Sequence, residues 1–559
     1  MAEPSKDPVK SRYEAARARR ALWDGLLDEA YRYGLPQHPS PMINGPDRNA
    51  SRGERKGGKV YDNTAAIALD ERAALDVNNL FPVATRWLLV DPDIDTSTEG
   101  GKKLAEIAET AFETCQRAFD DSNFGTEIYP AIRDARISIG NISLNKGDDR
   151  QPLMFEAVPV SETIAEESAD GVIRTSFRPL KMTLRQFGEK WPDVKLPNEL
   201  ATKAETDPES EIELVEGDIY DDKTAQTEYR LWLVADWKEL TTFTDQVGRN
   251  ILFRTDRVPG EIMGRGAIIH ALPDIRTADK VVELTLKNAS IAVTGIWQAD
   301  DDGVINVANI KLVPGTIIPK AVGSAGLTPL QTPGNFDVSS LVLSDLQKQI
   351  VRTIKGPDLP PVNEGVRTAF EFSLRRADQE AVEWPRMDRI ERELFIRLVR
   401  RALWILTDPY FAGTDYGIEL PTRANAPAPD AQDQNSEDAS PQTMDRIEFV
   451  DMLMRALETP SDRLKKETDA RTAYSGVAAA ADLFGIEIVA QKLKSMKFLG
   501  DFLSRSGVKA EHMTTEEEDE RNEAAAQQQV QQAQQQEQAT NVLSAIGNAE
   551  DGGSSSVAA

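Results

Sequence analysis

One stretch of the chain has the residue spacing of a phosphate-binding loop. Residues 53–59, Gly-Glu-Arg-Lys-Gly-Gly-Lys, fit the pattern in which two glycines precede a phosphate-binding lysine. Three features argue against nucleotide binding. Val60 replaces the hydroxyl residue that should hold magnesium, residues 46–52 are polar rather than strand-like, and the next predicted helix begins only near Thr64. We therefore interpret residues 53–59 as a mobile basic loop.

Three consecutive carboxylates, Asp300, Asp301 and Asp302, precede Gly303 and resemble part of a cation-binding loop. A calcium loop needs ligands at alternate positions and a terminal glutamate, and this segment has neither. The pattern favours a solvated turn between two short strands. A hairpin tip that faces a basic partner is the alternative interpretation.

The remaining chemistry-bearing residues are few. The chain has one cysteine, Cys115, and three histidines that lie far apart in the sequence. A disulfide framework and a cysteine-rich zinc site are therefore excluded, and no metal or cofactor is expected. Cys115 falls on the apolar stripe of a predicted helix, Lys102–Phe119, so we predict that it is a small buried hydrophobic residue.

Length and composition predict several domains with real cores. The chain has 559 residues, 40% of them hydrophobic, and a formal net charge of -27. This charge argues against a general nucleic-acid binder, which normally carries a basic face. No apolar run approaches the ~20 residues that a membrane-spanning helix needs, and Met1–Lys10 lacks the apolar core of a signal peptide. We expect a soluble protein.

The N-terminal half combines helices with a strand-rich lobe. Apolar spacing predicts helices at Tyr13–Tyr33, Thr64–Leu80 and Lys102–Phe119. From Ala135 to Asp256 the period changes toward two, which predicts an α+β lobe. Its expected elements are a hairpin that turns at Asp170-Gly171 between Glu162–Ser168 and Val172–Arg178, a helix at Thr183–Trp191, and strands at Tyr229–Trp237 and Asn250–Thr255.

The stretch from Asp274 to Leu406 is the most informative about function. A predicted helix, Asp274–Val293, leads into a strand-like block, Thr294–Pro319, and a second helix follows at Val338–Ile354. The apolar stripes of the two helices are too narrow for a free-standing pair and suit packing between neighbouring subunits. These stripes consist of Val281, Leu284, Asn288 and Ile291 in the first helix, and Leu341, Leu346, Ile350 and Ile354 in the second.

A loop and a long helix complete this stretch. The loop Lys355–Thr368 combines Lys355 and Arg367 with glycines and prolines, and by itself it is a connector between helices. The helix that ends near Leu406 mixes arginines and glutamates, which indicates salt-bridged faces or subunit contacts.

The C-terminal part is predicted to be helical and then of low complexity. Pro421–Pro441 is a linker, and Met513 to the end is predicted to be disordered or a fraying helix. Between them we predict helices at Met444–Glu458, Ala470–Phe484 and Glu487–Lys497.

Several segments, taken in order, resemble the portal or head-to-tail connector proteins of short-tailed double-stranded DNA phages (podovirus type). The resemblance covers most of Val9 to about Gln538, and the ordered set carries it rather than any single motif. The segments are the N-terminal helix, Val60-Tyr61-Asp62-Asn63-Thr64, Leu80-Phe81-Pro82 before Trp87, Leu184-Arg185-Gln186-Phe187-Gly188, Gly264-Arg265-Gly266 before Ala271-Leu272-Pro273-Asp274-Ile275, Val313-Pro314-Gly315, Arg367-Thr368-Ala369-Phe370-Glu371, Arg389-Ile390-Glu391-Arg392-Glu393-Leu394, and the glutamine-rich tail.

The resemblance implies an α+β, predominantly helical ring subunit with wing, stem, clip and crown regions. In chain order the implied regions are a wing (1–273, with the lobe at 135–256), a first stem helix (274–293), a clip and its return (294–337), a second stem helix (338–354), a channel loop (355–368), a wing-spanning helix (369–420), a linker (421–443), crown helices (444–512) and a disordered or barrel-like tail (513–559).

The resemblance also implies roles for single residues and no catalytic group. Lys355 and Arg367 would contact DNA from the channel loop. The clip residues that would face the terminase or the tail adaptors are Trp297, Asp300, Asp301, Asp302 and Lys311, and the residues that would pack the stem are Val281, Leu284, Ile291, Leu346 and Ile350.

The function implied is a homo-oligomeric ring of twelve subunits at one capsid vertex of the virion, assembled in the host cytoplasm. Double-stranded DNA would be packaged through its channel by the large terminase ATPase and later ejected. The major capsid, scaffolding and tail adaptor proteins would be further partners, and no membrane is involved. A conduit must let DNA slide, and an acidic subunit with few channel cations avoids trapping it. There are two alternatives. One is a different structural virion protein without a DNA channel, and the other is an enzyme such as a packaging motor.

Overall fold

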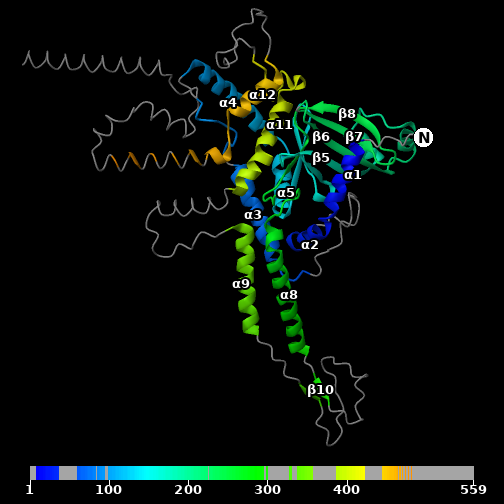
Figure 1. Ribbon diagram of the computed structural model, residues 1–559, viewed down its shortest axis with the longest axis vertical. Helices are drawn as coiled ribbons and strands as arrows, with labels where there is room; N and C mark the ends of the chain where they lie inside the picture. The colour runs from blue at the N-terminus through cyan, green and yellow to red at the C-terminus, as the bar shows by residue number, and fades with distance from the viewer. Residues whose placement is uncertain are drawn as a thin grey trace, which may run out of the picture. The chain divides into compact units, whose positions relative to one another are not determined.

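A computed structural model of the chain describes residues 8–36, 60–83, 85–94, 98–224, 226–294, 297–299, 327–329, 336–356, 385–421 and 444–463, with a few further positions between residues 465 and 480. The described residues form a mixed α+β structure that is mostly helical, as predicted (Figure 1). They divide into two compact units, one of residues 1–85 and 118–405 and one of residues 86–117 and 406–559.

The first unit begins with two helices where the sequence predicted a single one. Helix α1 spans Pro8–Ala21 and helix α2 spans Asp24–Gly34, with a turn at Leu22 and Trp23 between them. The prediction of one continuous helix over Tyr13–Tyr33 was therefore wrong.

Packing explains this break, because the two helices bury their apolar faces in different cores. Tyr13 and Ala16 of α1 join a cluster with residues of the large sheet. Leu27 and Tyr31 of α2 join a separate cluster with the helices described below. A continuous helix could not present both faces to both cores, so the chain turns between them.

Two further helices pack together in the first unit. Helix α3 spans Thr64–Leu80, as predicted. Helix α5 spans Phe124–Ile137, a segment for which the sequence indicated no helix and placed strand character from Ala135 onward. That boundary was wrong by three residues, because the last helical turn is buried against the following strand and keeps its helical hydrogen bonds to Ser138.

A three-stranded antiparallel sheet follows α5, in the order β3-β2-β9. Its strands are β2 (Gly140–Lys146), β3 (Leu153–Ala157) and β9 (Asn250–Phe253). A Cβ atom on Gly140 would lie 2.4 Å from the carbonyl oxygen of Ala131 and 2.5 Å from the ring of Phe253. Only glycine therefore allows this approach of β2 to α5 and β9.

A five-stranded antiparallel sheet has the order β4-β5-β6-β7-β8. The strands are β4 (Ile164–Glu167), β5 (Ile173–Thr183), β6 (Glu211–Asp221), β7 (Gln226–Leu233) and β8 (Lys238–Asp245), and the short 3-10 helix η2 (Val160–Glu162) precedes them. The hairpin predicted at Asp170-Gly171 is confirmed, because β4 pairs with β5 and Gly171 has a φ of +81°.

The two faces of this sheet carry separate cores. One face packs with α1 through Phe177 and Trp232 (Figure 1). The other face is covered by α6 (Leu184–Lys190) and α7 (Asn198–Thr206). Helix α6 begins with a capping box. The helix predicted at Thr183–Trp191 is thereby confirmed, with its hydroxyl cap explaining where it starts.

The region predicted to contain two long helices does so. Helix α8 spans Ala267–Thr294 and helix α9 spans Phe336–Lys355. Strands β10 (Trp297–Ala299) and β11 (Leu327–Pro329) lie between them in the sequence and pair antiparallel.

The last helical stretch of the first unit contains a π-helical turn. Residues 385–390 are helical, η4 (Glu391–Phe395) is the π-helical part, and α11 (Ile396–Leu406) continues from it. Glu393 in this turn pairs with the buried guanidinium of Arg254, whose Nη2 lies 2.9 Å from Glu393 Oε1. This ion pair attaches the helix to the end of β9.

The second unit contains most of α4 (Glu99–Asp120), η5 (Pro409–Phe411), α12 (Arg446–Arg455), and strands β1 (Leu89–Val90) and β12 (Leu457–Glu458). The two strands pair antiparallel, so the helix predicted to reach Glu458 ends earlier. The predicted helices Ala470–Phe484 and Glu487–Lys497 fall almost wholly outside the described residues.

Candidate functional site

Away from their base, helices α8 and α9 are largely exposed among the residues that the structure describes. At ~1.5 Å per residue, the 28-residue α8 is ~42 Å long and the 20-residue α9 is ~30 Å long. The two helices lie side by side and run in opposite directions (Figure 1).

The base of the pair is held in a hydrophobic core. Ile350 and Ile354 of α9 are fully buried, together with Ile275 and Ala278 of α8. Residues of α2 and α3 complete the same cluster, among them Leu27, Tyr31, Ala65 and Leu69. The pair is therefore anchored at one end by side chains from four helices.

The residues predicted to pack the two helices have different environments. Ile350 lies in the basal core, and Leu346 is half-buried against it. Val281 is half-buried and Leu284 is 49% exposed, whereas the side chain of Ile291 lies outside the described residues. Their packing against neighbouring subunits stays a prediction.

Away from the base, both helices expose large apolar side chains. Leu284 and Leu286 of α8 are 49% and 53% exposed, and Leu341 and Val342 of α9 are 67% and 42% exposed. Two of them, Leu286 and Val342, do not belong to the stripes that the sequence indicated. We take these four exposed apolar side chains as a candidate protein interaction surface.

Charged residues on α8 are paired with each other. Glu283 accepts a hydrogen bond from Lys280 Nζ at 2.7 Å and also pairs with Lys287 one turn further. The hydrogen bonds from Lys280 and Lys287 lower the pKa of Glu283 to about 2. Two lysines share this one carboxylate, so the trio keeps a net charge of +1.

The exposed face of α9 has a different charge pattern. Asp345, Lys348 and Arg352 recur at three- and four-residue intervals on the side opposite Ile350, and all three are exposed. In the part of the chain that the structure describes, Lys348 and Arg352 form no ion pair. The sequence analysis did not predict a role for Lys348 and Arg352, because it considered only the apolar stripe of this helix.

The end of α9 is fixed to α3 at Lys355, the first residue of the predicted channel loop. The Lys355 ammonium pairs with Glu71, and its backbone carbonyl accepts a hydrogen bond from Arg72 Nη1 at 2.5 Å. Gly356 follows with a φ of +95°, a conformation that glycine adopts readily at a helix end. Helix α3 thus holds Lys355, the last residue of α9.

A buried charge pair lies behind this attachment. Asp76 Oδ1 accepts from Arg72 Nε at 3.0 Å, and its Oδ2 accepts from Arg136 Nε at 2.5 Å. Asp76 and Arg136 are fully buried, so each compensates the desolvation of the other. Arg72 is therefore oriented by a carboxylate that is itself held by α5.

The segment before α3 connects the two long helices. Asp279 Oδ1 of α8 accepts from the backbone N–H groups of Tyr61 and Asp62, at 2.5 Å and 3.1 Å. Gln347 of α9 donates to Asp62 Oδ1 at 3.1 Å. These residues belong to the Val60–Thr64 segment that contributes to the family resemblance, which gives that segment a structural role.

Most other residues predicted to be functional cannot be placed. Trp297 lies in β10 opposite Pro329. Asp300, Asp301, Asp302, Lys311 and Arg367, and residues 53–59, lie outside the described residues.

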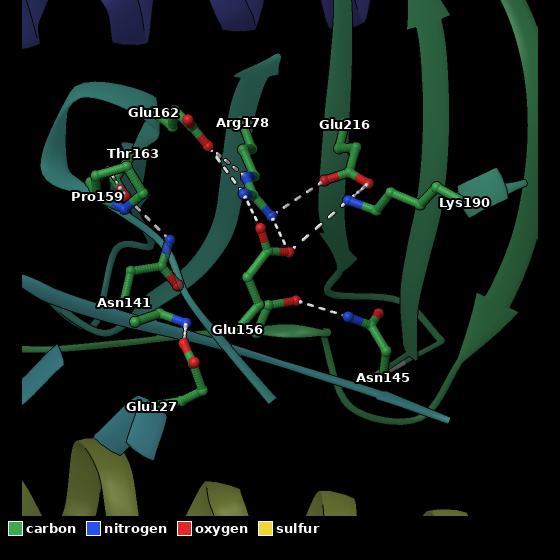
Figure 2. A network of polar contacts seen from close by, with 12 residues as sticks. Glu127, Asn141, Asn145, Glu156, Pro159, Glu162, Thr163, Arg178, Lys190 and Glu216 are labelled. Carbon is green, nitrogen blue, oxygen red and sulfur yellow. Dashed lines mark hydrogen bonds and ion pairs between the residues drawn. The ribbon is translucent and has the colours of Figure 1, made fainter. Parts of the chain in front are cut away.

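The α+β lobe contains a buried charge network that the sequence reading missed. Figure 2 shows Arg178 of β5 between Glu156, Glu162 and Glu216. Its Nη2 lies 2.7 Å from Glu156 Oε1 and 2.8 Å from Glu162 Oε2. Burial disfavours the charged guanidinium, but the hydrogen bonds and charges of the glutamates outweigh it and raise the pKa of Arg178.

This network joins two sheets rather than forming an open site. Glu156 comes from β3 of the small sheet, whereas Arg178 and Glu216 come from β5 and β6 of the large one. Glu216 also accepts from the Tyr229 hydroxyl at 3.0 Å. The arginine is fully buried, and we assign the network to the stability of the lobe.

A second buried acid lies near the network. Burial raises the pKa of Asp218 to about 6, although its Oδ2 accepts a hydrogen bond from the backbone N–H of Asn250 at 2.7 Å. Asp218 has no nucleophile or metal cluster beside it. Among the described residues, no group of His, Cys, Asp and Glu side chains could hold a metal ion.

The cysteine is confirmed as a buried side chain. Cys115 is inaccessible to solvent in α4, and burial raises the pKa of its thiol. In the part of the chain that is described, no helix has both the length and the apolar character to cross a membrane.

Comparisons with known proteins point to one family. The family model described as "Bacteriophage head to tail connecting protein" matches residues 6–409. These residues include α1 to α11, the basal core and the whole α8–α9 pair. A search of curated proteins found no match.

Proposed function

Because the chain belongs to the bacteriophage head to tail connecting protein family, we propose that it forms a ring whose α8–α9 pairs surround the passing viral DNA. Proteins of this family are structural components of the head-tail junction of the virion and not enzymes. The proposal adds the ring, the DNA channel and the contacts made by particular residues.

The exposed apolar side chains of the α8–α9 pair carry the proposal. Leu284 and Leu286 are two positions apart, so at ~100° per residue they lie on opposite flanks of α8. Apolar groups on two flanks suit a subunit with a neighbour on each side. Such head-to-tail contacts between different surfaces generate closed rings when the rotation closes. Ile67 and Leu75 of α3 are also exposed apolar side chains.

The charge pattern supports a conduit rather than a tight DNA binder. The chain carries a formal net charge of -27, which keeps a duplex from adhering along the wall. Lys348 and Arg352 are the exposed cations of α9, and Lys355 stands at its end. We propose that these cations centre the duplex, with Arg367 in the following loop as a further contact.

The remaining regions follow the order of the chain. We propose that β10 and β11 mark the clip that meets the large terminase ATPase during packaging and the tail adaptors afterwards. The N-terminal helices and the lobe of residues 135–256 form the wing (residues 1–273), and the helices of residues 444–512 form the crown. The ring has twelve subunits and belongs to a short-tailed phage in this proposal, with the capsid and scaffolding proteins as its neighbours.

The decisive experiment is electron microscopy of the purified full-length protein combined with light scattering. We expect ring-shaped particles with an axial hole. The double variant Leu284→Asp/Leu286→Asp should remain a folded single subunit, because it places a charge on each of the two flanks of α8 that are proposed to contact neighbours.

Met154→Asp is a matched control, because Met154 is 53% exposed but lies on β3. The control should still form rings. Compact single subunits of the unaltered protein under all conditions, or assemblies without a hole, would contradict the proposal and favour a different structural virion protein.

A further inference from the structure

A pocket of about 380 Å³ opens beside the turn between α1 and α2. This volume lies at the lower end of the ~300–1,000 Å³ typical of ligand pockets. It accommodates one large side chain and the backbone beside it rather than a whole helix. None of its lining residues belongs to the α8–α9 pair, so binding at this pocket does not depend on the proposed ring.

The floor of the pocket is apolar. Ala16 of α1, Ala165 of β4 and Met263 are buried beneath it. Trp23 and Leu26 form a half-buried wall. This surface suits an aliphatic or aromatic side chain.

The rim of the pocket is cationic. Arg19, Arg20 and Arg265 line it, and Glu261 is the one acidic lining residue. Glu261 is already engaged, because both of its carboxylate oxygens accept from Arg265 at 2.7 Å. In a chain of net charge -27 this is a local excess of positive charge.

Two features of the rim are typical of protein contact sites. The guanidinium of Arg265 lies over the Trp23 ring at 5.2 Å from its centroid, and tryptophan and arginine are enriched among the residues that dominate binding energy. Leu22, in the turn, is 84% exposed at the same edge. A partner that filled the pocket would also cover this leucine.

We propose that this pocket binds a segment of another protein in which an aromatic or large aliphatic side chain is flanked by carboxylates. The apolar side chain enters between Trp23 and Met263. A flanking carboxylate meets the exposed Arg19, whose planar guanidinium group matches carboxylate geometry. Arg20 contributes positive charge from the pocket wall, where its Nη1 donates to the Ser161 carbonyl oxygen at 2.9 Å. The chain carries a strong negative charge and repels acidic segments over most of its surface. The basic rim makes this pocket a favourable site for such a segment.

The test uses a fluorescein-labelled peptide, Asp-Glu-Phe-Glu-Asp, and the full-length protein. We expect saturable binding by fluorescence anisotropy that weakens at least tenfold in Arg19→Glu and weakens as salt is raised. The exposed Arg117→Glu, outside the pocket, should bind like the unaltered protein. Peptides with alanine in place of phenylalanine, or lysines in place of the acids, should bind at least tenfold more weakly.

A spectroscopic readout locates the peptide. Binding of unlabelled peptide should change the tryptophan emission, and this change should be lost in Trp23→Phe. Absence of binding up to millimolar peptide, or equal binding by Arg19→Glu or by the lysine peptide, overturns the proposal. Binding by single subunits that disappears in assembled particles also overturns it, because the occupant is then a second copy of this chain.

Discussion

Arg178 in the large sheet and Arg352 on α9 carry the same guanidinium group in opposite surroundings. Arg178 is buried and makes ion pairs or hydrogen bonds with three glutamates from three other elements. Arg352 is exposed, and among the described residues it pairs with no acid. Among the described residues, the chain therefore pairs Arg178 internally and leaves Arg352 exposed without an acidic partner.

The same contrast holds for the apolar residues of the two regions. Phe177 and Trp232 of the lobe are buried against α1, whereas Leu341 of α9 is two-thirds exposed. The core of the lobe is therefore covered within this chain, whereas the distal half of the helix pair exposes apolar side chains. Mutations in the lobe should therefore change stability, and mutations on α8 and α9 should change assembly or DNA transport.

The largest expected effect is on the buried network. Arg178→Met removes the cation beside the buried Glu162 and leaves Glu216 with Lys190, and the free energy of unfolding should fall by about 3–5 kcal/mol. Urea unfolding followed by circular dichroism measures this loss. Arg185→Met, which breaks two ion pairs at the surface, with Glu189 and Glu209, is the matched control and should leave the unfolding midpoint nearly unchanged. Equal midpoints for the two variants would remove the distinction between buried and exposed cations.

An intermediate effect is expected at Asp218, and it depends on pH. Its pKa is raised to about 6 in the folded protein, so the folded state binds the proton more tightly than the unfolded chain does. The contribution of Asp218 to the free energy of unfolding is largest below pH ~4. It falls by roughly 2–3 kcal/mol as the pH rises through about 6.

Asp218→Asn should remove most of that pH dependence and should stabilise the protein above pH ~6, because the carboxylate no longer has to ionise in a buried place. Unfolding midpoints measured from pH 4 to pH 8 check this expectation. A variant whose midpoint follows the same pH curve as the unaltered protein would show that Asp218 does not titrate in this range.

The smallest effect on stability is expected on α9. Lys348→Glu/Arg352→Glu should change the free energy of unfolding by no more than about 0.5 kcal/mol, because both side chains are exposed. Ring formation should persist, whereas the yield of packaged DNA should fall, since the proposed duplex contact changes sign. An unchanged packaging yield would show that these two cations do not contact the DNA.

Local signals explain why several elements were predictable. The helices α3, α8 and α9 show an apolar period of 3.6, and the turn between β4 and β5 contains Asp170-Gly171, a pair that favours a hairpin. The threonine cap of α6 lies three residues before the glutamine that completes its capping box. Each of these signals lies within a few residues of the structure that it determines.

The elements that were missed depend on partners far along the chain. The break between α1 and α2 arises because Tyr13 and Leu27 belong to different cores, and β12 forms only because Leu89–Val90 is available to pair with it. Nothing near Leu22 or Leu457 encodes those partners.

The family resemblance, the helix pair and the acidic balance of the chain could be read from residue order, because periodicity, turn residues and charge are local or additive. Residue order did not show which cations are neutralised by acidic partners. Arg178 meets Glu156, 22 residues away, and Lys355 meets Glu71 of a helix near the start of the chain. Such contacts exist only after packing has brought the strands and helices together, so tertiary structure alone separated the buried ion pairs from the cations left exposed on α9.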